Sequence, residues 1–256
     1  MSRLSQYLYD GIWPDELAIS GFHSRRSLRK DDEVPRFARS LMQKIHLNDV
    51  FLTVQGEGAN AGRRSLFVRM PFCNLKCPWC DTEFNSFNEW DTQDFINFAA
   101  SASGRFAVLT GGEPSMHKHT PTVIEILKSL GYEIAMESNG MFPPPKGVDW
   151  LTVSPKGFSN NPYSIAPPAF VEASEFKYVI DEGFDWKVLE RHGPTMSVLK
   201  IVEGDRETQF INGRAMLYLS PEHTRMDRNV VSILRYQEMH PWWRLSLQTH
   251  KWIGAK

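Results

Sequence analysis

Residues 65–82 read SLFVRMPFCNLKCPWCDT, and this stretch decides how the rest of the sequence is interpreted. Its first part, residues 65–70, is a short apolar run typical of a buried strand. Its second part holds Cys73, Cys77 and Cys80, at spacings of four and three residues. A loop that follows a strand can wrap three thiols at these spacings around one inorganic centre. The stretch therefore predicts a strand that leads into a metal site.

The number of cysteines narrows the kind of metal site. The 256-residue chain contains only these three, and an odd, tightly spaced set argues against a disulfide framework. Structural zinc normally takes four protein ligands and an iron–sulfur cluster four cysteines, so three cysteines leave one metal position open for a cofactor. Two alternatives stay open at this point: zinc completed by a histidine or by Asp81, and three buried thiols without a metal.

Outward from the cysteines, short apolar runs alternate with amphipathic stretches. A helix is expected over residues 121–130, with Pro121 in its first turn and Gly131 just past its end, and another over residues 227–239. This alternation implies parallel βαβ units, with ligand sites at the carboxyl ends of the strands. We expect an α/β fold, an incomplete parallel barrel shorter than eight repeats. The expected strands are VFLTV (50–54), SLFVRM (65–70), FAVLT (106–110), YEIAME (132–137), WLTVS (150–154), EFKYVI (175–180), MLYLS (216–220) and RLSLQ (244–248).

Composition excludes several classes of function. Twenty-nine basic and 30 acidic residues give a formal charge of −1, so no global field attracts nucleic acid or anionic lipid. No apolar run is long enough to cross a bilayer, and the polar start lacks the apolar core of a secretory signal, which predicts a cytoplasmic protein with no membrane partner. Residues 1–45 carry no motif and are expected to form an extension of unknown role before a core domain at 46–256. A basic run at 25–30 leaves a nucleic-acid contact there as an alternative to simple packing, although direct binding of nucleic acid is not expected.

Several polar motifs end the predicted strands. TGGEP follows the run at 106–110, and its glycines let backbone groups approach a ligand closely. ESNG (137–140) and VSPK (153–156) offer a carboxylate, hydroxyls and a cation at the same edge of the sheet, although capping and turn chemistry would use the same residues. QGEG (55–58) forms a glycine-punctuated loop suited to the hydrogen-bonding edge of a flat heterocycle.

CNLKCPWC is similar to the three-cysteine motif of the radical S-adenosylmethionine superfamily, including the aromatic Trp79 before the last cysteine. Together with VQGEGANAGRRSLFVRM, CDT, LTGGEP, ESNG, VSPK and LSLQTHKWIG, it resembles the family of 7-carboxy-7-deazaguanine synthases, from about Leu47 to Lys256. The resemblance implies a partial βα barrel of the radical S-adenosylmethionine type. It also implies a four-iron four-sulfur cluster on Cys73, Cys77 and Cys80, with S-adenosylmethionine on its open iron, and Mg²⁺ at Thr82.

The resemblance also assigns binding residues. At Ser220 the family usually has glutamine, so the shorter hydroxyl would reach the adenosyl group only through water or a shifted loop. In the family the carboxyl terminus closes the pocket, so the main-chain carboxylate of Lys256 is expected to matter more than its side chain. His250 is expected to orient the terminal segment or to contact a ligand. Cofactor contacts are implied for Gly111, Gly112, Glu113, Glu137, Ser138, Ser154, Pro155, Lys156, Ser220, Pro221, Glu222 and His223, and substrate contacts for Val54, Gln55, Gly56, Glu57, Arg69, Thr110 and Lys256.

The implied activity is a lyase-type ring contraction of 6-carboxy-5,6,7,8-tetrahydropterin to 7-carboxy-7-deazaguanine, with release of ammonia, in queuosine and 7-deazapurine biosynthesis. No catalytic side chain is implied beyond the cofactor-derived radical. A flavodoxin or ferredoxin would supply the electron, and the family usually forms homodimers. Two other functions are weighed against this one: a glycyl-radical activase that keeps the radical chemistry but acts on a protein, and a zinc-stabilised binding module.

Overall fold

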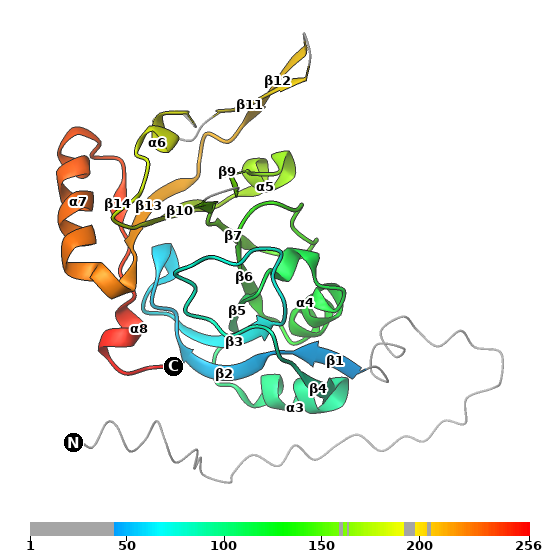
Figure 1. Ribbon diagram of the computed structural model, residues 1–256. Coiled ribbons are helices and arrows are strands. Elements are labelled where there is room, and N and C mark those ends of the chain that lie inside the picture. The colour runs from blue at the N-terminus through cyan, green and yellow to red at the C-terminus, as the bar shows by residue number, and fades with distance from the viewer. Residues whose placement is uncertain (1–43, 159–160, 163, 192–197, 204–205) are drawn as a thin grey trace, which may run out of the picture. The chain divides into compact units, whose positions relative to one another are not determined.

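The computed structural model describes residues 44–158, 161–162, 164–191, 198–203 and 206–256, and Figure 1 shows their arrangement. Its centre is an eight-stranded sheet in the order β14-β13-β10-β7-β6-β5-β3-β2. β2 pairs with β3 in antiparallel register, and the other neighbouring strands pair in parallel. The eight strands are β2 (Asp49–Val54), β3 (Arg64–Met70), β5 (Phe106–Gly111), β6 (Glu133–Ser138), β7 (Trp150–Val153), β10 (Glu175–Ile180), β13 (Met216–Pro221) and β14 (Arg244–Leu245).

The two faces of this sheet differ in chemistry because side chains alternate along each strand. On β6, Ile134 and Met136 belong to the main hydrophobic core, together with Val123 and Leu127 of the neighbouring helix. Ala135, between them, points to the other face and belongs to a second, smaller apolar group. Further along that second face polar side chains replace apolar ones, so it offers space and hydrogen bonds where the strands end.

Helices cover the apolar face. The longer ones are α3 (Thr92–Ser101), α4 (Thr120–Ser129) and α7 (Met226–Met239), and Figure 1 shows α4 beside β5 and β6, and α7 beside β13 and β14. α4 begins with Pro121 in its first turn, and Gly131 follows its end with a φ of 78°, a left-handed conformation that glycine adopts without strain. The short helices are α5 (Pro167–Glu172), α6 (Lys187–Arg191) and α8 (Thr249–Trp252).

Three two-stranded ribbons lie outside the central sheet, and three 3-10 helices, η1 (Gly58–Asn60), η2 (Pro114–Met116) and η3 (His223–Arg225), lie between strands and helices. β1 (Lys44–Leu47) pairs with β4 (Asn88–Asp91), β8 (Gly157–Phe158) with β9 (Asn161–Pro162), and β11 (Val198–Glu203) with β12 (Arg206–Ile211). β1 buries Ile45 and Leu47 completely and spans the boundary expected at residue 45. The rest of the extension expected at 1–45, including its basic run, lies outside the described residues.

The structure confirms the α/β class and the open barrel, because β2 and β14 are sheet edges and not partners. Seven of the expected strands and both expected helices are present. The strand expected at 244–248 was wrong in extent: β14 contains only Arg244 and Leu245. The Ser246 N–H still donates to Leu219 O of β13 at 2.9 Å, but its hydroxyl accepts from the Gly58 N–H, and Gln248 beyond it bonds Glu57. Consequently Gln248, Thr249 and His250 do not end a strand; α8 begins at Thr249.

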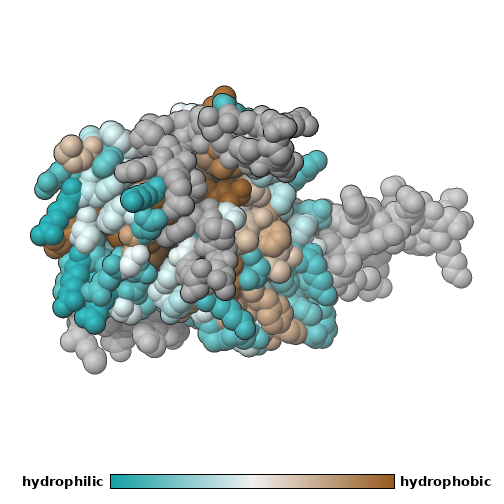
Figure 2. All heavy atoms as spheres, turned by 45° about the horizontal axis from the view of Figure 1, so that its top comes forward, coloured by the Kyte–Doolittle hydropathy of each residue, from teal (hydrophilic) through white to brown (hydrophobic). Residues whose placement is uncertain are grey.

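No helix in the described part of the chain is long and apolar enough to cross a membrane. Figure 2 shows one face of the molecule, where hydrophilic side chains surround a smaller group of apolar ones.

Candidate functional site

A cavity of about 190 Å³ opens where the parallel strands end. The three cysteines line it, as do residues from the loops after β5, β6, β7 and β13. Ligand sites of open α/β sheets lie at this edge, so its position is the expected one. The predicted site residues on its wall are Glu57, Thr110, Gly111, Gly112, Glu113, Glu137, Ser138, Ser154, Lys156, Ser220, Pro221, Glu222 and His223.

The cysteine loop presents free thiols to this cavity. Cys73 and Cys77 are half-buried and Cys80 is exposed. Burial, with smaller contributions from Glu113 and the neighbouring thiols, raises the pKa of Cys73 to about 11, and burial also raises the pKa of Cys77. Burial therefore opposes ionisation of Cys73 and Cys77, and a bound metal would favour their thiolate forms.

The thiols fit an iron–sulfur cluster better than a single ion. Among the residues that the structure describes, no three His, Cys, Asp or Glu side chains lie close enough to share one metal ion. Three cysteines of an iron–sulfur cluster each bind a different iron, so they surround a volume and need not converge on a point. Their shared place on the cavity wall satisfies that requirement.

Gly111, which ends β5, and Gly112, which follows it, bring the backbone against the cysteine loop. The Gly112 N–H donates to Met70 O at 2.8 Å, and the Glu113 N–H donates to Phe72 O at 2.8 Å. A Cβ at Gly112 would lie 1.7 Å from Phe72 O, and Gly111 has a φ of 108°. Phe72, directly before the first cysteine, itself has a φ of 61°. The close approach at position 112 and the positive φ at position 111 both require glycine. The Gly-Gly motif therefore fixes the path of the cysteine loop and also forms part of the cavity wall.

Glu113 and the end of β6 hold the loop from the other side. The Glu113 carboxylate is 1% exposed and accepts hydrogen bonds from Ser138 Oγ at 2.9 Å and from the Asn139 N–H at 2.7 Å. Asn139 Nδ2 in turn donates to Asn74 Oδ1 at 2.8 Å, within the cysteine loop. One carboxylate thus connects β6 and the loop after β5 to the residues next to Cys73.

The predicted cofactor residues on the later strands also reach the cavity, with one exception. Ser154 Oγ donates to Lys177 O at 2.7 Å and accepts from Lys156 Nζ, whose pKa burial lowers. Pro155 is buried but does not line the cavity. Glu222 caps the turn after β13 by accepting from the Thr224 N–H at 2.9 Å, and its Oε1 lies 3.1 Å from His223 Nδ1.

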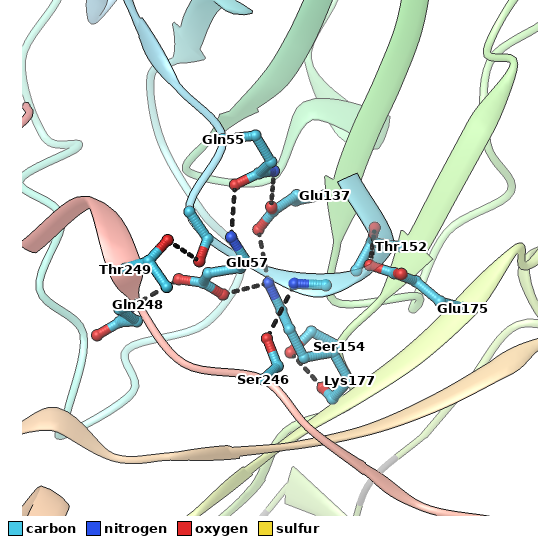
Figure 3. Close-up of polar contacts among 12 residues, drawn as sticks. Gln55, Glu57, Glu137, Thr152, Ser154, Glu175, Lys177, Ser246, Gln248 and Thr249 are labelled. Atoms are coloured by element: carbon cyan, nitrogen blue, oxygen red, sulfur yellow. Dashed lines mark hydrogen bonds and ion pairs between the residues drawn. The ribbon is translucent and has the colours of Figure 1, made fainter. Parts of the chain in front are cut away.

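A closed ring of hydrogen bonds forms the inner wall, as Figure 3 shows. Gln55 Nε2 donates to Glu137 Oε1 at 2.9 Å, and Lys177 Nζ donates to Glu137 Oε2 at 3.1 Å and also to Glu57 Oε2. The Glu57 N–H donates to Gln55 Oε1 at 3.1 Å, and this bond closes the ring. Glu57, Glu137 and Lys177 line the cavity, whereas Gln55 stands behind them.

The terminal segment closes this wall. Gln248 Nε2 donates to Glu57 Oε1 at 2.7 Å, and the N–H and hydroxyl of Thr249 both donate to Gly56 O. His250 lies so close to Gly56 that a Cβ there would be 2.0 Å from the Nδ1 atom of the histidine. The structure thus gives His250 a packing contact with the predicted substrate loop, and burial lowers its pKa.

Besides Pro155, Gln55 and Gly56, four predicted site residues lie outside the cavity wall: Val54, Arg69, Thr82 and Lys256. Arg69 and Lys256 both lie over the Phe51 ring, with Cζ and Nζ at 4.9 and 4.6 Å from its centre. Lys256 Nζ is 2.6 Å from Asp49 Oδ2, and Thr53 Oγ1 donates to Lys256 O at 3.0 Å. Val54 ends β2. Thr82 adjoins Asp81, which lines the cavity and pairs with Lys251, so hydroxyl and carboxylate oxygens of the kind that Mg²⁺ prefers lie together there.

The sequence interpretation missed Lys177. It lies within the apolar strand EFKYVI, and a lysine in such a run is the one available signal, because a buried ammonium must be paired. Asn74 and Ser246 were missed as well, and neither stands out from ordinary loop residues.

Comparison with known proteins agrees with this geometry. The model of the radical SAM superfamily matches residues 67–169. The chain is 32% identical over 219 residues to 7-carboxy-7-deazaguanine synthase of Synechocystis sp., covering 81% of this chain and 92% of the relative. It is 33% identical over 229 residues to the synthase of Haemophilus influenzae, covering 84% of this chain and 100% of the relative.

A solved structure has the same fold. The crystal structure of QueE from Escherichia coli superposes with a TM-score of 0.65 at 21% identity, covering 84% of this chain and 99% of the other. At that identity the likeness establishes the architecture alone. The identity to the two synthases over nearly their full length establishes the family: this chain belongs to the 7-carboxy-7-deazaguanine synthases of the radical SAM superfamily.

Proposed function

We propose that the chain converts 6-carboxy-5,6,7,8-tetrahydropterin to 7-carboxy-7-deazaguanine, with release of ammonia, in the biosynthesis of 7-deazapurines such as queuosine. The observation that carries the proposal is the cavity itself. One cavity is lined by the three cysteines, the Gly-Gly-Glu segment, the loop after β13 and Glu57, and Glu57 lies in the predicted substrate loop. The named relatives of the family make this product.

Residues of this cavity would bind the cofactors. Cys73, Cys77 and Cys80 would hold the four-iron four-sulfur cluster, and S-adenosylmethionine bound to it would supply the radical that removes a hydrogen atom from the substrate. The chain's own part is to bind and orient. Backbone at Gly111 and Gly112 and the residues after β6, β7 and β13 would contact S-adenosylmethionine, and Thr82 would bind Mg²⁺.

The substrate would lie against the inner wall. Carboxylate oxygens of Glu57 suit the N–H groups of a pterin edge, and Thr110 lines the same cavity. The guanidinium of Arg69 suits the substrate carboxylate, because a planar cation binds a carboxylate in a bidentate manner. Gln55 and Gly56 support this wall from the loop after β2, through the bonds of Gln55 to Glu57 and of Gly56 to Thr249. Val54 and Lys256 would contribute from beside it, where Lys256 O accepts from Thr53.

The partners follow from the chemistry. A reduced cluster requires a one-electron donor, and we propose a flavodoxin or ferredoxin. We also propose a homodimer, as is usual in the family, and a cytoplasmic location, where three clustered thiols stay reduced for metal binding.

The test is turnover under anaerobic conditions. Enzyme reconstituted with iron and sulfide is given S-adenosylmethionine, Mg²⁺, a reductant and the carboxytetrahydropterin, and the product is detected by mass spectrometry. Cys77→Ala should lose the product, whereas Asn97→Ala, on the exposed side of α3, should retain it. Cleavage of S-adenosylmethionine without deazaguanine would show that the substrate is wrong.

A further inference from the structure

Lys177 is a buried cation that none of the predicted site motifs contains. It lies in the middle of β10 and is 4% exposed, while its neighbours Phe176 and Tyr178 are fully buried. Moving an ammonium group out of water costs several kcal/mol unless opposite charges and hydrogen bonds replace the water. The buried position of Lys177 therefore requires partners that offset this cost.

Those partners come from distant parts of the chain. Glu57, from the loop after β2, is 120 residues away, and Glu137, on β6, is 40 residues away. Burial opposes the charge of Lys177, but the carboxylates of Glu137 and Glu57 outweigh it and raise the lysine pKa. Burial would raise the pKa of Glu57, but Lys177 outweighs this effect and lowers it. The Lys177 ammonium and the Glu57 carboxylate therefore keep each other charged.

The two carboxylates depend on Lys177 to different degrees. Glu137 stands on a central strand, whose backbone is fixed by ladders to β5 and β7. Glu57 stands on a loop, and its carboxylate is held by Gln248 and Lys177. Removal of the ammonium would therefore displace Glu57 more than Glu137.

We propose that Lys177 is a positioning residue that holds the Glu57 carboxylate ionised and in place to accept hydrogen bonds from the substrate. This inference rests on the proposed function, because it assumes a substrate with an N–H edge. Each oxygen of a carboxylate can accept two hydrogen bonds, so Glu57 still has acceptor capacity beyond Gln248 and Lys177. Lys177 acts through Glu57, without a contact of its own to the reacting atoms.

Without the ammonium the hydrogen-bonding pattern of the wall changes. Two carboxylates that share a buried site cannot both stay ionised easily, so one takes a proton and becomes a donor. A protonated Glu57 would then face the N–H groups of the substrate with the wrong polarity. The other charged or titratable groups around the ring are Glu175 on the same strand, Lys156 after β7 and His250 on α8.

The test separates substrate binding from cofactor binding in reconstituted enzyme. Lys177→Met should raise the KM for the carboxytetrahydropterin by about tenfold or more, the usual effect of losing a hydrogen bond to a charged group. Its Kd for S-adenosylmethionine, measured by equilibrium binding, should change much less than this KM, because Glu137, the implied cofactor contact that also bonds Lys177, is fixed on a central strand. Tyr178→Phe, on the opposite face of the same strand, is the matched control and should keep the wild-type KM.

Two further variants connect the effect to Glu57. Adding Glu57→Gln to Lys177→Met should raise KM no more than Glu57→Gln alone, since both changes remove the same acceptor. Lys177→Arg keeps the charge and should recover most of the affinity for the substrate. If Lys177→Met does not fold, Lys177→Arg replaces it in the test.

An unchanged KM in Lys177→Met, or equal losses of affinity for the substrate and for S-adenosylmethionine, would overturn the inference. If Lys177→Met does not fold, a KM for Lys177→Arg as high as that of Glu57→Gln would do so. A wild-type enzyme that makes no product would instead overturn the proposed function.

Discussion

At the scale of single residues, the glycine after Gly111 is fixed by a backbone contact. A Cβ at position 112 would lie 1.7 Å from Phe72 O, an atom that cannot move without shifting the cysteine loop. Gly112→Ala should lower the free energy of unfolding by about 2 kcal/mol or more, as overpacking against fixed atoms does. Denaturant unfolding of the metal-free protein measures this loss.

Gly213 provides the comparison for this prediction. A Cβ there meets nothing within 4 Å. Gly213→Ala should change the free energy of unfolding by less than about 0.5 kcal/mol. Equal losses in the two variants would mean that the contact with Phe72 is not the cause.

Also at the residue scale, His117 gives the protein an acid-sensitive stability. Burial, with smaller effects of His119, His46 and Lys118, lowers its pKa from 6.5 to about 4. The unfolded chain therefore binds a proton more readily than the folded one, and stability that is complete above pH 6.5 is lost as the pH falls toward 4. His117→Gln should flatten this part of the pH profile, measured as free energies of unfolding at pH 7, 5.5 and 4.5. An identical slope in both proteins would contradict the prediction.

At the scale of elements, local sequence predicts what is decided locally. The α4 helix is bounded by Pro121 and Gly131, and central strands such as β5 are continuous apolar runs, so both could be predicted. The β1–β4 ribbon could not, because NEWD at 88–91 has no strand pattern of its own and pairs only when residues 44–47 lie beside it. β14 is short for the same kind of reason: after Ser246, whose N–H still donates to Leu219 O, the chain leaves the sheet, and Gln248 bonds Glu57 of a distant loop.

The attachment of the cysteine loop is a second property of elements. Asn139, just after β6, donates to Asn74 Oδ1 and accepts from the Met141 N–H at 2.9 Å. Asn139→Ala removes this hydrogen bond between the end of β6 and the cysteine loop. The reconstituted variant should lose iron to a chelator severalfold faster than the wild type, because a charge-free hydrogen bond of this kind contributes about 1 kcal/mol. Asn97→Ala, an exposed change on α3, should lose iron at the wild-type rate. Equal rates of iron loss in all three proteins would show that the Asn139–Asn74 hydrogen bond does not hold the cysteine loop.

At the scale of the whole molecule, the cavity is predictable in outline and its inner wall is not. Parallel strands bring their carboxyl ends together, so motifs such as Gly-Gly-Glu and Ser-Pro-Lys could be placed at one edge from the sequence. The ring through Lys177 depends on segments 120 and 40 residues away, and their meeting follows from the strand order, which local patterns do not give.

The whole molecule should also gain stability when its cavity is filled. Ligands that bind only the folded state stabilise it, by about 2.7 kcal/mol at one hundred times Kd. Reconstitution with iron and sulfide followed by S-adenosylmethionine should therefore raise the Tm stepwise, and a chelator should reverse both steps. Because Cys77 is a half-buried residue of the cavity wall, Cys77→Ala should unfold near the wild-type Tm without metal but gain nothing from S-adenosylmethionine. If the variant gained as much as the wild type, the cofactor would bind without the iron–sulfur cluster, and the assignment of the three thiols as its anchor would be wrong.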